Sequence, residues 1–159
     1  MIVDHLVGQW NEHYFRHYWG SVYQVRDPIY CRTVASGGDS HGNSISGPRY
    51  LTAVGDTLYF RAGDGVNGWE LWKSDGSEDG TQLVKDIYPG AQSSNLSYLT
   101  DVNGTLFFIA SEGTLGEELW RSDGTADGTV LVKDIREGSN GSSAYSLANL
   151  NGILFFSAS

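Results

Sequence analysis

The chain reads Glu118-Leu-Trp-Arg-Ser-Asp-Gly-Thr-Ala-Asp-Gly-Thr-Val-Leu-Val-Lys-Asp-Ile135, and its architecture follows from this stretch. Forty-eight residues earlier it reads Glu70-Leu-Trp-Lys-Ser-Asp-Gly-Ser-Glu-Asp-Gly-Thr-Gln-Leu-Val-Lys-Asp-Ile87. Twenty-five of 48 positions are identical between residues 51–98 and 99–146, and residues 147–159 begin a third copy. A fixed period of this length indicates a supersecondary unit repeated in tandem.

Each copy predicts four short strands. In the second copy, residues 98–102 and 105–110 flank Asn103-Gly104, which supplies the positive φ angles of a type I′ hairpin turn. A glycine-bearing loop leads to a third strand over 118–122, and an Asp-Gly turn leads to a fourth over 129–135. A four-stranded meander that recurs with this period is typical of a β-propeller. We therefore expect an all-β fold of tandem four-stranded antiparallel blades.

The repeat also predicts the division of the chain. Residues 51–98 and 99–146 are full blades, and residues 147–159 are a partial blade, all within one domain. The aromatic-rich residues 1–50 are either a degenerate first blade or an unrelated segment that caps the array. A leucine-rich repeat is excluded, because its unit is much shorter than the period seen here. So few blades leave open strand edges, which another chain, or further units of a longer array, would have to complete.

Composition narrows the class of partner. The net charge of −9 speaks against nucleic acid and anionic membranes, which both select basic surfaces. No apolar run is long enough to predict a membrane-spanning helix. The single cysteine, Cys31, excludes an intramolecular disulfide and is expected to be a small buried residue. Residues 1–8 do not resemble a signal peptide, so a secreted location would require another leader or another export route.

The recurring motif carries a resemblance to a known family. Glu70-Leu-Trp-Lys-Ser-Asp-Gly-Ser and Glu118-Leu-Trp-Arg-Ser-Asp-Gly-Thr, each followed by a Gly-Thr pair, resemble the ELWxxDGT tandem repeats of large bacterial secreted or surface proteins. The similarity covers residues 51–159. It implies a propeller-like extracellular structural or binding module, and it does not imply an enzyme.

The Asp-Gly turns permit two interpretations. Asp75, Asp79, Asp123 and Asp127 offer carboxylate oxygens of the kind that Ca²⁺ binds, and Ca²⁺ is the only cofactor that the sequence leaves open. Alternatively, the first aspartate of each turn accepts hydrogen bonds from backbone N–H groups two residues on. The turn also resembles the structural Asp-box of sialidase-type propellers. The pattern lacks the distal glutamate of an EF-hand, and we favour the structural interpretation.

The tryptophans likewise divide into core and candidate contacts. Trp72 and Trp120 recur at one position of the unit, so we expect them in the core between blades. Trp69 has no copy at position 117 and is the better candidate for an exposed ligand-binding contact, for example with a glycan.

Other polar residues give weaker hypotheses. Glu70, Lys85 and Asp86, with their copies in the second unit, are expected to form ion pairs and turn bonds between neighbouring blades. His13 and His17 have the i, i+4 spacing of two metal ligands on a helix, but the chain lacks the His-Glu-x-x-His order of a zincin. Ordinary surface histidines are the favoured interpretation for these and for His5 and His41. No catalytic motif is present in the sequence.

These observations predict a non-enzymatic structural, assembly or adhesion module, secreted or at the cell surface, which self-associates through its open strand edges into a ring or filament. The alternative is a carbohydrate- or calcium-binding lectin-like propeller with one site per blade. A glycan hydrolase is the third and least favoured hypothesis. Such an enzyme needs two carboxylates placed in one pocket, and the sequence does not identify such a pair.

Overall fold

The computed structural model describes residues 21–26, 30–35 and 48–159 of the chain. This part contains twelve strands and no helix, so none that could span a membrane. The predictions for the four histidines and for the side chain of Cys31 lie outside the described residues. The strands are β1 (Ser21–Arg26), β2 (Tyr30–Ala35), β3 (Arg49–Val54), β4 (Thr57–Gly63), β5 (Trp69–Ser74), β6 (Gln82–Lys85), β7 (Ser97–Val102), β8 (Thr105–Ser111), β9 (Glu117–Ser122), β10 (Val130–Lys133), β11 (Tyr145–Leu150) and β12 (Ile153–Ser157).

All described sheets are antiparallel, and neighbouring strands in each sheet are consecutive in the sequence. Strands β3 to β6 form one four-stranded sheet, and strands β7 to β10 form a second. Strands β1 and β2, and strands β11 and β12, form two-stranded sheets. The all-β class and the antiparallel four-stranded sheets that the sequence predicts are therefore confirmed.

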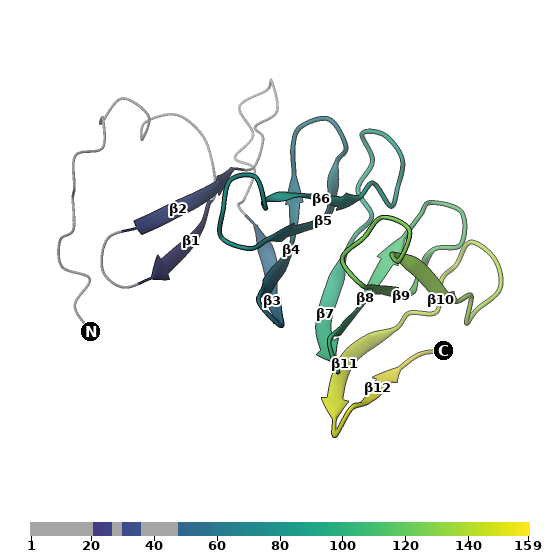
Figure 1. Cartoon of the computed structure of the whole chain (residues 1–159). Helices are drawn as coiled ribbons and strands as arrows, with labels where there is room; N and C mark the ends of the chain where they lie inside the picture. Colours follow the sequence, from purple (N-terminus) through teal and green to yellow (C-terminus); the bar gives the residue numbers. More distant parts are fainter. Residues whose placement is uncertain (1–20, 27–29, 36–47) are drawn as a thin grey trace.

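The two four-stranded sheets share one register. Phe60 pairs with Trp72 between β4 and β5, and Phe108 pairs with Trp120 between β8 and β9. Strand β7 lies beside both β3 and β11, so the first strands of three successive units are neighbours (Figure 1). We call residues 51–98, 99–146 and 147–159 the first, second and third units. The fourth strands, β6 and β10, lie at the opposite edges of their sheets.

The first hairpin of the second unit has the turn that its sequence predicts. Asn103 and Gly104 have φ angles of 54° and 82°. These two residues of positive φ make a type I′ turn, whose twist matches that of the flanking strands. The equivalent turn of the first unit has a positive φ at Gly55, 57°, but not at Asp56, which is the pattern of a type II′ turn.

The fourth strand is shorter than the sequence predicts. It covers Val130–Lys133 instead of residues 129–135. The reason is that the backbone N–H of Ile135 donates to the carboxylate of Glu118 at 3.1 Å, so the chain has left the ladder by this point. A side chain on β9 thus ends the strand beside it.

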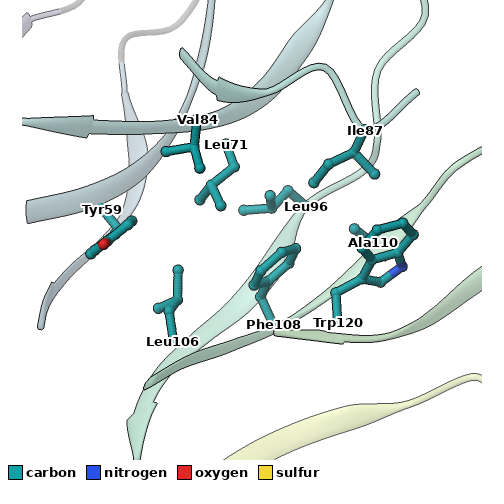
Figure 2. Packing of buried hydrophobic residues seen from close by; sticks show 9 residues of the cluster. All are labelled: Tyr59, Leu71, Val84, Ile87, Leu96, Leu106, Phe108, Ala110 and Trp120. Atoms are coloured by element: carbon teal, nitrogen blue, oxygen red, sulfur yellow. The ribbon is translucent and has the colours of Figure 1, made fainter. Parts of the chain in front are cut away.

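The main core lies between the first and second sheets. Phe108 and Trp120 of the second unit face Leu71, Val84 and Leu96 across the interface (Figure 2). Trp120 is buried, as its recurrence predicts, whereas Trp72 is only partly buried and packs against Phe60. A smaller core between the second sheet and β11–β12 contains Ile109, Leu119 and Ala144, with Phe107, Ile135, Leu147 and Leu154 packed against it.

Hydrogen bonds between units repeat with the same spacing. The hydroxyl of Thr52 donates to the carbonyl of Leu99 at 3.2 Å, and that of Thr100 donates to Leu147 at 3.5 Å. The N–H of Ser111 donates to Ser94 at 2.8 Å, and that of Ser159 donates to Ser142, also at 2.8 Å. The third unit therefore meets the second much as the second meets the first.

Phe108 and Phe156 occupy the same position of the unit but differ in burial, which gives a direct test of this core. Phe108 is fully buried, and Phe156 is 37% exposed. We expect Phe108→Ala to lower the free energy of unfolding by about 3–5 kcal/mol, and Phe156→Ala to lower it by less than half of that. Urea denaturation measures both values, and Phe→Leu at each site serves if the first variant does not fold. Equal losses would contradict the packing between the first two sheets.

Candidate functional site

The two Asp-Gly turns are held by the same internal hydrogen bonds. In the second unit, Oδ1 of Asp123 accepts from the N–H of Thr125 at 2.9 Å and from its hydroxyl at 2.7 Å. The hydroxyls of Ser122 and Thr129 lie 2.7 Å apart, and that of Ser122 also accepts from the N–H of Gly124 at 3.0 Å. Matching bonds close the turn of the first unit. Each turn therefore satisfies its backbone with its own side chains.

This geometry gives two of the four predicted calcium ligands a structural role. Hydrogen bonds from Ser77 and Thr125 lower the pKa values of Asp75 and Asp123, respectively, below the ordinary value. The other two predicted ligands, Asp79 and Asp127, are exposed on the same turns. Within the described residues, no group of three or more His, Cys, Asp or Glu side chains is placed to hold a metal ion. The calcium site stays a prediction.

A buried carboxylate links the third strand of the first unit to the segment that leads to the second. Glu70 is fully buried, and its Oε1 and Oε2 accept hydrogen bonds from the N–H groups of Ser94 and Ile87, both at 2.9 Å. Burial raises the pKa of Glu70 to about 7, although both N–H donors favour the ionised form. The side chain thus satisfies two buried donors at the cost of desolvating a carboxylate.

The second unit repeats half of this arrangement. Oε2 of Glu118 accepts from Ile135, while Oε1 is buried without a hydrogen-bond partner in the described part of the chain. The N–H of Ser142 donates to the carbonyl of Glu117 at 3.0 Å, as that of Ser94 donates to the carbonyl of Trp69 at 3.2 Å. Both glutamates therefore accept hydrogen bonds from backbone N–H groups of the segment that follows the fourth strand of their unit. The ion pairs predicted between units for Glu70, Lys85, Asp86 and their copies are not formed in the described residues, where the glutamates bind backbone N–H groups.

Two lysines of the first unit bind the turn of the second, so the turn bonds predicted between units are present. Nζ of Lys73 donates to the carbonyl of Gly124 at 2.8 Å. Nζ of Lys85 donates to the carbonyls of Thr129 at 2.8 Å and Ala126 at 3.2 Å. Lys73 is not among the residues for which the sequence predicts a contact between units. The available signal was the recurrence of a cation at both lysine positions in the second unit, combined with the Asp-Gly turn.

Trp69, the predicted ligand-binding residue, is partly buried at the start of β5. The guanidinium of Arg61 lies over its ring, 5.4 Å from the ring centroid. Burial lowers the pKa of Arg61. The indole therefore already has a stacking partner within the protein, and its binding of a glycan stays a prediction.

Several large apolar side chains of β10, β11 and β12 are exposed. They are more exposed than their counterparts in the preceding unit. Leu150 is 59% exposed where Val102 is 7% exposed, and Val132 is 44% exposed where Val84 is 5% exposed. Ile153 and Phe155 are 60% and 52% exposed. We call the exposed residues Val132, Leu150, Ile153, Phe155 and Phe156 together the open apolar surface, although Phe155 and Phe156 lie on opposite faces of β12.

Comparison of the chain with models of protein families, with curated proteins and with solved structures finds no match.

The buried carboxylate predicts how stability depends on pH. The pKa of Glu70 is about 7 in the folded state and 4.5 as its ordinary value, so the folded state holds the proton more tightly than the unfolded state. The resulting contribution to stability is about 3 kcal/mol. It is fully present below pH 4.5 and is lost as the pH rises through 7. Glu70→Gln removes this dependence. We expect the destabilisation caused by the variant to be larger at pH 4 than at pH 8.

Chemical denaturation at several pH values measures this difference. Glu78→Gln, at an exposed turn position, controls for the change in net charge. A destabilisation by Glu70→Gln that is the same at all pH values would contradict the raised pKa.

Proposed function

We propose that this chain is a non-enzymatic structural module, propeller-like in its repeated blades, that works by assembly with other chains outside the cell. The resemblance of the repeat to the ELWxxDGT family and the net charge of −9 support the secreted or cell-surface location. The bounds of β1, which precede those of β5 by one full period of the repeat, support a degenerate blade at the start. In this proposal, the surface that the repeated blades form binds other chains, and this binding is the assembly or adhesion function.

The observation that carries the proposal is the open apolar surface. Large apolar side chains that are exposed together on one edge hairpin, as Leu150, Ile153 and Phe155 are, are typical of a surface that binds another molecule. Val132 and Phe156 belong to repeat positions that are buried between the first and second units. Strand β12 also pairs only with β11 in the described part of the chain, whereas β8 pairs on both sides. An unpaired edge beside an apolar face is a template for another strand.

The repeated contacts support a directional assembly. Since the third unit meets the second as the second meets the first, a contact added at β12 would join one end of a molecule to a different surface of the next. A contact of this heterologous type produces rings if it closes and filaments if it does not.

Light scattering over a range of concentrations tests the proposal. We expect the average mass to rise with concentration, and we expect Leu150→Asp with Ile153→Asp to hold the protein as a monomer. Both residues are largely exposed, so the charges should leave the fold intact. Val66→Asp, at a 69% exposed position in the loop after β4, is the matched control and should associate like the parent chain. A single monomeric species at every concentration would contradict the proposed assembly.

A further inference from the structure

The contact between the first and second units has two parts, and the first part is polar. Lys73 and Lys85 hold the carbonyls of the turn at residues 124–129. Their counterparts in the second unit are Arg121 and Lys133, which are both exposed. In the described residues, neither of these two cations donates a hydrogen bond to another group. The second unit thus presents a pair of cations at the position where the first unit binds a turn.

The second part is apolar. Trp120 packs in the cluster that contains Leu71, Val84, Ile87 and Leu96 of the first unit (Figure 2). The counterparts of these four residues are Leu119, Val132, Ile135 and Ala144. Leu119 and Ala144 are already buried under β11–β12, but Val132 is far more exposed than Val84. Of the contacts that the indole makes in the first unit, the counterpart at Val132 is therefore left exposed, next in sequence to Lys133.

The backbone supplies the third element of the site. Strand β8 pairs with β9 along its outer edge, with Leu106 opposite Ser122 and Ser111 opposite Glu117. Strand β12 has the same position in its unit, but no described strand pairs with its outer edge. Its end is placed as in β8, because Ser159 donates to Ser142 as Ser111 donates to Ser94. A strand added here in the register of β9 would set its tryptophan on Val132 and its turn on the cations.

We propose that Arg121, Val132, Lys133 and the outer edge of β12 bind a β-hairpin of the repeat's own sequence, with a Glu-Leu-Trp strand and a Ser-Asp-Gly-Thr turn. This inference rests on the proposed assembly function and names its partner. The occupant is identified by three requirements that an arbitrary strand does not meet together: a tryptophan within the strand, the carbonyls of a tight turn directly after it, and antiparallel pairing to β12.

A labelled peptide of residues 112–135 tests the proposal against the full chain by fluorescence anisotropy, at concentrations where the chain is monomeric. We expect saturable binding, together with slower hydrogen exchange at the amides of β12. The same peptide with Trp120→Ala should bind at least about 30-fold more weakly, as expected of an aromatic anchor in an interface. Equal binding of a scrambled peptide would overturn the proposal, since it would indicate unspecific pairing at an open edge.

Two lysines at equivalent positions provide a crossed control. Lys133→Ala should weaken peptide binding about tenfold, because it removes a charge-assisted hydrogen bond, and should leave the melting temperature unchanged. Lys85→Ala should lower the melting temperature, because its bonds are internal, and should leave peptide affinity unchanged. Loss of affinity in neither variant, or in both, would overturn the assigned turn site.

Extension of the chain gives a second test that does not depend on the solubility of a peptide. Since Ser159 is in phase with Ser111, residues 112–135 joined directly after Ser159 continue the repeat. The extended chain should melt at a higher temperature and should no longer bind the peptide. An unchanged melting temperature would overturn the inference.

The failure of this inference and of the proposed assembly are separate outcomes. A chain that associates with itself but ignores the peptide overturns the hairpin site and leaves assembly in place. A chain that binds the peptide but stays monomeric supports the hairpin site and removes self-association.

Discussion

The packing of one sheet face against the next is the interaction on which the rest of the structure depends. A single four-stranded sheet with an apolar face has no means of removing that face from water on its own. The first and second sheets solve this together, with Phe108 and Trp120 of one against Leu71 and Val84 of the other. Once these two faces pack in a fixed register, the polar groups of the two units lie within hydrogen-bonding distance of each other. The same requirement explains why the outermost face of the described chain is left exposed.

Burying such an interface brings backbone groups out of water, and the structure satisfies them with side chains. Glu70 accepts from two N–H groups of the segment after β6, and Lys73 and Lys85 donate to carbonyls of the next turn. These charged side chains are therefore tied to backbone geometry instead of to each other. Because their partners are backbone groups, these hydrogen bonds do not depend on which side chain the neighbouring unit carries at the contact. It also leaves a carboxylate whose burial makes the stability of the fold sensitive to pH.

Much of the fold could be predicted from the sequence, because the information is local and repeated. Asn103-Gly104 specifies its turn by steric preference alone, and the recurrence of Trp120 indicates a core position. The carbonyls that Lys73 and Lys85 bind could not be predicted, because those partners are set by how one sheet rotates against the next. The role of Glu70 could not be predicted for the same reason: a recurring acid and a recurring lysine indicate an ion pair until the positions of the backbone donors are known. The exposure of Val132 requires the structure too, since its sequence neighbours match those of the buried Val84.

Thr52 and Thr100 make equivalent hydrogen bonds to the first strand of the following unit, and these bonds restrict how the length of a chain built from this repeat can change. Each unit contacts only its neighbours, so energies accumulate by nearest-neighbour terms, as in other repeat proteins. Gain or loss of one whole period would preserve every contact type, whereas a change of any other size would break the threonine bonds and the turn bonds together. Tandem duplication is therefore the insertion that this architecture tolerates best, and the number of units is free to drift while their spacing is not.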